Sequence, residues 1–243
     1  MSVLCAPASG VWIVLCHPSD PRNVGSCIRA VANFGLAGLR LVGGEGFDDE
    51  ALDAFASGAL SQVRIERFAT VPEALHDARL TLGTSRRHHD EDGPSQWPLA
   101  DLRPRLGERA PVCVLFGHER NGLSRAELDY CDAVVSIPTT TTFPSMNLSH
   151  AVACLGYELT RPDTSTWAKG AGASSGPKTL VRDAVFREIA TICDEIGFPP
   201  GRRGQSLARR LRRLLTRADA TAAEMSLLAG VFRELRRLSG PRT

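Results

Sequence analysis

The sequence predicts an α/β protein with a mostly parallel sheet, followed by a small helical domain. Short runs typical of β-strands alternate with helical patterns along residues 1–160, as in an α/β domain. Several of these runs are apolar throughout, as parallel strands covered on both faces should be. A stretch rich in Gly, Ser, Ala and Pro at 161–178 then predicts a flexible linker to a basic helical domain at 179–243.

The expected strands are short and rich in residues that favour β-structure. In chain order they are 11–16, 39–42, 63–68, 80–83, 112–117 and 133–138. The helical stretches between them are about 23–34, 48–58, 71–77, 124–130 and 148–160. The tail reads as two helices, 179–198 and 205–238. On the second of these, arginines surround a face formed by Leu207, Leu211, Leu214 and Leu215.

Size and composition suit a soluble protein. The chain has 243 residues, of which 43% are hydrophobic, enough for one full-sized domain and a smaller one. The opening MSVLCAPASG lacks a basic region followed by an apolar core, and the next run, VWIVLC, is too short to span a bilayer. We therefore expect a cytoplasmic protein without a membrane segment.

Cysteine and histidine spacing indicates no metal site. Seven cysteines are scattered without any CxxC pair, and the six histidines show no spacing typical of ligands. Most of the cysteines lie in apolar runs, so buried and reduced thiols are expected.

Charge is divided unevenly along the chain. Residues 1–177 contain 15 Lys and Arg against 20 Asp and Glu, residues 178–243 contain 14 against 7, and together they give the formal net charge of +2. The basic tail indicates either an anionic partner or a helical bundle with solvated basic faces, and charge alone does not decide between them.

The first polar constellation lies in HPSDPRNVGSCIRAVANFG, directly after the first strand. Its apolar residues form a buried helical stripe, and Arg29 lies on the opposite, polar face. Asn23 is suited to cap this helix and Gly35 to end it. The polar face lies near the carboxyl end of the strand, where open α/β sheets bind ligands. An ordinary surface arginine is the alternative interpretation of Arg29.

A second constellation, FGHERNGLSRAEL, places a polar turn between two glycines. Gly117 and Gly122 would allow a close approach of the backbone to a ligand or a positive φ. Ser124 and Glu127 form a capping box that starts the next helix. Neither GxxxxGK[ST] nor GxGxxG occurs in the chain, so a P-loop and a dinucleotide-binding fold have no support.

The third constellation, FPSMNLSHAV at 143–152, gathers more polar side chains than one helix start requires. Ser145 or Asn147 would suffice as a cap. The surplus predicts a binding site at this helix entry.

These constellations resemble the three motifs of the SPOUT superfamily of RNA methyltransferases, in the blocks NVGSCIRAVANFGLAGLRLV, FGHERNGLS and IPTTTTFPSMNLSHAVACLGYEL. Their order and spacing are most similar to the TrmH/SpoU branch, which methylates ribose 2'-hydroxyls with S-adenosylmethionine. The tail segments FREIATICDEIGF and LARRLRRLLTRADATAAEMSLLAGVFREL resemble the C-terminal region of the TrmJ-type tRNA (cytidine/uridine-2'-O)-methyltransferases. The resemblance implies a C-terminal trefoil knot in the α/β domain and a homodimer that completes the active site.

The resemblance also implies roles for particular residues. Arg29 matches the motif 1 arginine that activates the ribose hydroxyl, and Asn23 matches the asparagine that opens this motif. Glu119 matches the motif 2 glutamate, and Ser145 and Asn147 match the polar pair of motif 3. The positions implied for cofactor contacts are Thr84, Ser85, Arg86, Gly117, Ile137, Pro144, Ser145 and Met146.

The function implied is 2'-O-methylation of tRNA at the first nucleotide of the anticodon loop, a cytidine or uridine. The methyl donor is S-adenosylmethionine, and its sulfonium makes a metal unnecessary. Two alternatives remain open at this point: the same reaction on ribosomal RNA, and an RNA-binding protein with an inactive knot.

Overall fold

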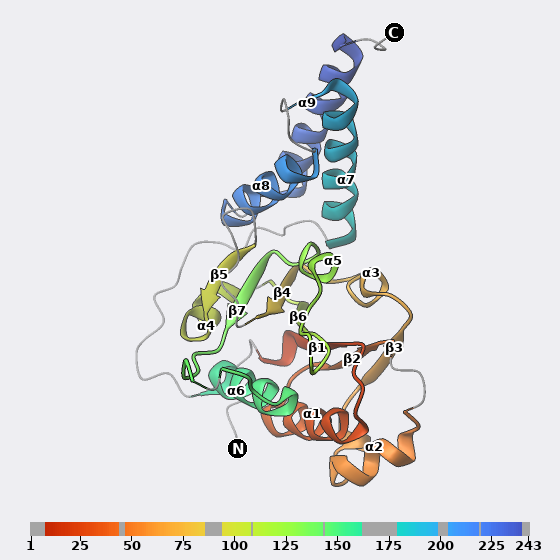
Figure 1. Cartoon of the computed structure of the whole chain (residues 1–243), viewed down its shortest axis with the longest axis vertical. Helices are drawn as coiled ribbons and strands as arrows, with labels where there is room; N and C mark the ends of the chain where they lie inside the picture. Colours follow the sequence, from red (N-terminus) through yellow and green to blue (C-terminus); the bar gives the residue numbers. More distant parts are fainter. Residues whose placement is uncertain are drawn as a thin grey trace.

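The computed structural model describes residues 8–43, 47–85, 94–107, 109–142, 144–161, 179–198, 204–218 and 220–239. In this part of the chain, seven strands form one parallel sheet in the order β3-β2-β1-β6-β4-β7-β5 (Figure 1). The strands are β1 (Val11–Cys16), β2 (Gly38–Val42), β3 (Ile65–Phe68), β4 (Leu80–Thr84), β5 (Ser95–Pro98), β6 (Val112–Phe116) and β7 (Ala133–Ser136). The predicted α/β class with a parallel sheet is confirmed, and the knot stays a prediction.

Helices follow most of the strands. The α-helices are α1 (Pro21–Phe34), α2 (Asp49–Ala56), α3 (Val71–Ala74), α4 (Leu102–Leu106), α5 (Arg125–Leu128), α6 (Leu148–Thr160), α7 (Thr179–Ile196), α8 (Gly204–Arg217) and α9 (Ala222–Ser239). Short 3₁₀ helices are η1 (Ala8–Gly10), η2 (Leu60–Gln62) and η3 (Leu99–Asp101). None of the described helices is long and apolar enough to cross a bilayer.

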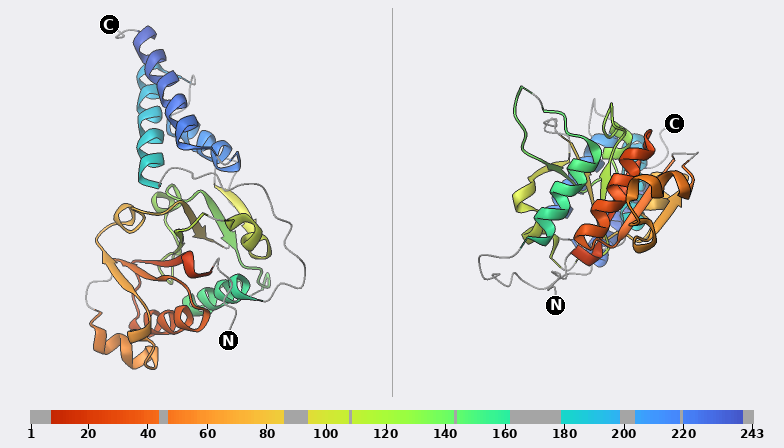
Figure 2. Two further views of the ribbon diagram at one scale, coloured as in Figure 1. Left: turned by 180° about the vertical axis from the view of Figure 1, so that it is seen from behind. Right: turned by 90° about the horizontal axis from the view of Figure 1, so that it is seen from below.

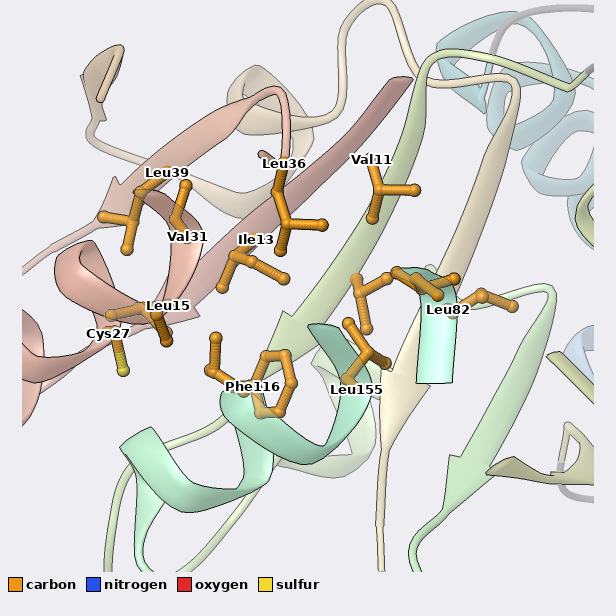
Figure 3. Packing of buried hydrophobic residues seen from close by; sticks show 14 of the residues in the cluster. Val11, Ile13, Leu15, Cys27, Val31, Leu36, Leu39, Leu82, Phe116 and Leu155 are labelled. Atoms are coloured by element: carbon orange, nitrogen blue, oxygen red, sulfur yellow. The ribbon is translucent and has the colours of Figure 1, made fainter. Parts of the chain in front are cut away.

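The sheet is covered on both faces, and β1 shows how its sequence achieves this. Because side chains alternate along a strand, one set from β1 faces α1, α2 and α6, and the other set faces α3. The first set is Val11, Ile13 and Leu15, and the second is Trp12, Val14 and Cys16. Figure 3 shows the first set packed with Val31 of α1 and Leu155 of α6. An all-apolar strand is therefore what this position in the sheet requires.

Helices α1 and α6 lie side by side over the same face of the sheet (Figure 2, right). Gly156 of α6 lies so close to Phe34 of α1 that an added Cβ would approach the ring to 2.4 Å. This packing brings motif 1, which opens α1, next to motif 3, which opens α6.

The sequence analysis missed β5 and α4. β5 has the sequence SQWP, which is polar, short and ended by a proline, so it carries little strand signal. Its place at the edge of the sheet, paired only with β7 among the described strands, is where such a strand is tolerated. α4 contains Pro104, which weakens its helical pattern.

The tail differs from the prediction in its number of helices. Residues 205–238 form α8 and α9 rather than one helix, because Thr221 and Glu224 make a capping box that starts α9. α7, α8 and α9 pack around an apolar cluster that includes Phe186, Ile189 and Met225. Leu214 is 52% exposed and does not share the inward face. The predicted linker lies, apart from its first residue, outside the described residues.

Arg40 is a charged residue inside the core, in a segment that the sequence predicts only as a strand. It lies on β2 and is 1% exposed. Its guanidinium donates to both carboxylate oxygens of Asp77, at 2.7 and 3.0 Å, and to Glu66 at 3.0 Å. It also stacks over the Trp12 ring at 4.3 Å from the centroid. Burial raises the pKa of the Asp77 carboxyl, but the bonds from Arg40 outweigh burial and lower it.

Replacing Arg40 by Leu is expected to lower the free energy of unfolding by about 3–5 kcal/mol, because it leaves two carboxylates without their buried partner. The matched control is Arg64→Ala, since Arg64 also pairs with Glu66 but is 70% exposed. Its loss is expected to cost below about 1 kcal/mol. Urea unfolding of both variants measures the difference. Equal costs would show that the buried network does not stabilise the sheet.

Candidate active site

A cavity of about 360 Å³ lies at the carboxyl ends of three neighbouring strands, β4, β6 and β7. Thr84 ends β4, Gly117 directly follows β6, and Ile137 directly follows β7, and all three line the cavity. Open α/β sheets bind ligands at this edge. The volume is within the range of small-molecule sites.

One wall of the cavity is the turn from Gly117 to Gly122, which folds back on itself. The Gly122 amide donates to the carbonyl of His118 at 2.8 Å, and Gly122 has a φ of 69°. A Cβ on Gly117 would lie 2.1 Å from the backbone of Gly122. Gly117 is therefore required by the fold of the turn itself. The predicted capping box of Ser124 and Glu127 is confirmed at the start of α5.

Glu119, in the middle of this turn, is held by four hydrogen bonds. The Ser19 amide donates to both carboxylate oxygens at 3.2 and 3.1 Å, and the Ser19 hydroxyl donates to Oε2 at 2.9 Å. The Asn23 side-chain amide donates to Oε1 at 3.2 Å. Burial raises the pKa of the Glu119 carboxyl, but a bond from its own backbone amide, together with the bonds from Asn23 and Ser19, lowers the pKa below its ordinary value. Glu119 is thus an ionised carboxylate occupied by donors from the start of α1.

Asn147 connects the third motif to the same network. Its Nδ2 donates to the Asn23 side-chain oxygen at 2.9 Å. Its own Oδ1 accepts from the amide and the hydroxyl of Ser149, at 2.9 and 2.7 Å, and so caps α6. Asn147 is the predicted cap, and Ser145 lines the cavity. The polar residues at this helix entry therefore have different roles: Asn147 caps α6 and contacts motif 1, and Ser145 lines the cavity.

The prediction that Asn23 caps α1 is wrong. The cap is Asp20, whose carboxylate accepts from the Arg22 amide at 2.9 Å, and the helix begins at Pro21. Proline suits the first helical position because its missing N–H would have no helical partner there. Asn23 therefore lies inside the first turn, and its side chain is available to join Glu119 to Asn147. Gly35 ends the helix as predicted, with a φ of 59°.

The structure brings together most of the residues that the resemblance implies for cofactor contacts. Seven of them line the cavity: Thr84, Ser85, Gly117, Ile137, Pro144, Ser145 and Met146. The eighth, Arg86, lies outside the described residues. The Thr84 hydroxyl donates to the Leu115 carbonyl at 2.9 Å, which fixes it at the end of β4.

Arg29 is not part of this cavity. It lies on the solvent face of α1, and its Nη1 donates to the Ser57 hydroxyl at 3.2 Å. Ser57 ends α2 with a φ of 54°, a left-handed conformation that is uncommon for a residue other than glycine. Within one chain, Arg29 is thus separated from the site to which the resemblance assigns it.

Sequence reasoning missed two kinds of residue at the site. The apolar side chains of Leu123, Leu128 and Val135 line the cavity, but they follow the same pattern as core residues and carry no separate signal. Ser19 lies 100 residues from Glu119, so nothing in its local sequence reveals their contact. Among the described residues, no group of three or more His, Cys, Asp or Glu is arranged to hold a metal.

Comparisons with known proteins show the family of this chain. Residues 10–157 match the model of the SpoU rRNA Methylase family. The chain is 31% identical over 251 residues to the tRNA (cytidine/uridine/adenosine-2'-O-)-methyltransferase TrmJ of Pseudomonas aeruginosa, covering 94% of this chain and 95% of the relative. It is 32% identical over 236 residues to the tRNA (cytidine/uridine-2'-O-)-methyltransferase TrmJ of Yersinia pestis, covering 91% and 90%.

A solved structure shows the same likeness. The crystal structure of TrmJ from Z. mobilis superposes with a TM-score of 0.74 at 29% identity, and the match covers 92% of this chain and 97% of that one. The family match includes all three motifs that form the cavity and its network. This chain belongs to the SpoU rRNA methylase family.

Proposed function

We propose that this chain is an S-adenosylmethionine-dependent methyltransferase that methylates a ribose 2'-hydroxyl in tRNA. The observation that carries the proposal is the cavity at the strand ends, whose walls contain motifs 2 and 3 and are joined to motif 1 through Glu119, Asn23 and Asn147. The names of the TrmJ relatives support tRNA as the substrate. The first nucleotide of the anticodon loop is the position we propose, from the resemblance of the tail.

The cavity suits the proposed cofactor. Apolar side chains of Val135, Ile137 and Leu148 line it and can contact a flat adenine ring, while Ser85 and Ser145 offer polar groups. The volume of about 360 Å³ accepts a ligand of this size class. When bound, S-adenosylmethionine supplies a methyl group already activated on a sulfonium.

The protein then has to orient a weak nucleophile and stabilise the negative charge that grows on its oxygen. A guanidinium can anchor the neighbouring phosphate and stabilise that charge, and we assign this role to Arg29. A guanidinium carries hydrogen-bond donors and no acceptor, so the action that we assign to Arg29 is electrostatic. We assign Asn23, Glu119 and Asn147 to holding the walls of the cavity, and Ser145 to contact with the ligands.

We further propose a homodimer in which Arg29 serves the cavity of a second copy. Arg29 does not line the cavity of its own chain and faces solvent. Tyr157, on the adjacent helix α6, is 61% exposed, which is unusual for a large aromatic residue. A partner that covers α1 and α6 would bury Tyr157 and bring a second Arg29 to each cavity.

The tail is proposed as a separate basic domain, residues 179–243, joined to the methyltransferase domain, residues 1–160, by the linker 161–178. Its apolar cluster contains only residues of α7–α9 and the segment between α8 and α9, which supports this division. Several of its arginines are committed to ion pairs: Arg212 with Asp183, Arg233 with Glu188, Arg236 with Glu195 and Arg237 with Glu234. The surface that we propose for RNA is the basic helix α8, which carries Arg209, Arg210 and Arg213.

If the tail contacts about four phosphates, log affinity for tRNA is expected to fall with log salt at a slope of roughly −3. Deleting residues 178–243 is expected to make the slope of log affinity against log salt less steep and to weaken binding of tRNA. Filter binding at several salt concentrations measures both. An unchanged slope and affinity after the deletion would assign the tail to packing alone.

Methyl transfer to tRNA tests the proposal as a whole. The family description names ribosomal RNA, so ribosomal RNA is the second candidate substrate and belongs in the same assay. A chain that binds no S-adenosylmethionine would instead be an inactive relative.

A further inference from the structure

Ser19 lies in the loop between β1 and α1 and donates three hydrogen bonds to the carboxylate of Glu119, while Asn23 donates one. The loop is fixed on both sides of it. The His17 amide donates to the Val42 carbonyl at 2.8 Å, and Asp20 caps α1. The chain is thus anchored two residues before Ser19 and at the residue after it. The Ser19 amide and hydroxyl are therefore held in place to donate to Glu119 with little further loss of conformational freedom.

The carboxylate of Glu119 is also close to its own backbone amide, and Ser19 and Asn23 are the contacts that connect it to the start of α1. The Nδ1 of His118 lies 4.0 Å from Oε2 of Glu119, beyond hydrogen-bond distance. That nitrogen instead accepts from the Arg120 amide at 3.1 Å. Ser19 and Asn23 therefore hold the carboxylate of Glu119 against the start of α1.

Two walls of the cavity depend on that carboxylate. The turn containing Glu119 forms one wall. Through Asn23, the same carboxylate is linked to Asn147, and the residues just before Asn147 form the second wall. A change at Ser19 is thus transmitted to both walls although Ser19 does not line the cavity.

We infer that Ser19 is a positioning residue for the cofactor site, acting through Glu119 to fix the two walls against the start of α1. This inference rests on the proposed function, since it takes S-adenosylmethionine as the ligand of the cavity. Under this inference Glu119 is not the group that removes the proton from the ribose hydroxyl, because both of its carboxylate oxygens already accept hydrogen bonds. Hydrogen bonds to a charged group are among the stronger ones, so losing the Ser19 hydroxyl is expected to change the affinity for S-adenosylmethionine measurably.

The experiment is a calorimetric titration of the full-length protein with S-adenosylmethionine. Ser19→Ala is expected to raise Kd about tenfold. Ser19→Thr keeps the hydroxyl and is expected to restore most of the affinity. The matched control is Ser61→Ala: Ser61 is also exposed, and its hydroxyl makes one long bond of 3.5 Å to the Gly58 carbonyl. It is expected to bind like the wild type.

A double-mutant cycle separates positioning from general loss of structure. In a Glu119→Gln background, Ser19→Ala is expected to add less than a twofold change, because the partner it holds is already altered. A full tenfold effect in that background would overturn the inference, since Ser19 would then act by another route. So would wild-type affinity in Ser19→Ala, or failure of Ser19→Thr to restore binding. If the wild type itself binds no S-adenosylmethionine, the proposed function fails and the inference fails with it.

Discussion

Replacing Arg29 by Ala is expected to lower methyl transfer to tRNA about 100- to 1,000-fold and to leave the affinity for S-adenosylmethionine unchanged. The guanidinium stabilises charge that develops only during transfer, so its loss affects the rate rather than cofactor binding. Arg29 does not line the cavity of its own chain, which explains why binding should survive. Single-turnover kinetics and a cofactor titration measure the two quantities.

The matched control is Arg67→Ala, because Arg67 is also a surface arginine, 44% exposed and paired with Asp49. It is expected to transfer methyl groups at the normal rate. Full activity in Arg29→Ala would remove Arg29 from the mechanism. Parallel loss of cofactor binding would mean that it has a structural role instead.

Mixed dimers test from which subunit Arg29 acts. Ser145→Trp is expected to fill the cavity and abolish binding in its own chain, since Ser145 lines it. Mixing Arg29→Ala with Ser145→Trp should then restore activity, because a dimer of the two contains one intact cavity facing one intact Arg29. Restoration fails if Arg29 serves its own chain, since both cavities of the mixed dimer would be defective.

Replacing Gly117 by Ala is expected to weaken binding of S-adenosylmethionine about 10- to 100-fold. The added Cβ would lie 2.1 Å from the backbone of Gly122, so the turn must open, and overpacking of this kind costs about 1–3 kcal/mol. The turn carries Glu119, and its displacement also breaks the contact with Ser19 and Asn23. Isothermal titration measures the loss.

Gly230→Ala provides the control for this substitution. Gly230 lies in α9, and a Cβ there has nothing within 4 Å. Alanine at an exposed helical position is expected to be neutral or slightly stabilising. Normal cofactor affinity in Gly117→Ala would show that the turn tolerates a side chain and that its shape does not define the cavity.

Local patterns in the sequence predicted the elements that local chemistry specifies. The alternation of apolar runs and helical stripes predicted six of the strands, and the box of Ser124 and Glu127 marked the start of α5. The same signature at Thr221 and Glu224 marks the break between α8 and α9, in a range that the helical pattern alone predicted as one helix. β5 was missed because an edge strand of polar residues has no pattern to distinguish it from a loop.

The candidate site was predicted through its motifs, but not its connections. The sequence indicated Asn23, Glu119 and Asn147 separately, and Asn23 was assigned to a cap that Asp20 supplies. Their contacts join positions 96 and 124 residues apart. The first depends on the pairing of β1 with β6, and the second on the packing of α1 against α6. Ser19 belongs to no motif, and only the folded chain shows that it holds Glu119.

The most direct measurement is transfer of labelled methyl groups from S-adenosylmethionine to unmodified tRNA, followed by alkaline hydrolysis. A 2'-O-methyl group blocks cleavage at its own linkage, so the account predicts label in an alkali-resistant dinucleotide whose first base is cytidine or uridine. Label released as mononucleotides would mean methylation of a base and would contradict the role of Arg29. Label on ribosomal RNA alone would contradict the choice of tRNA.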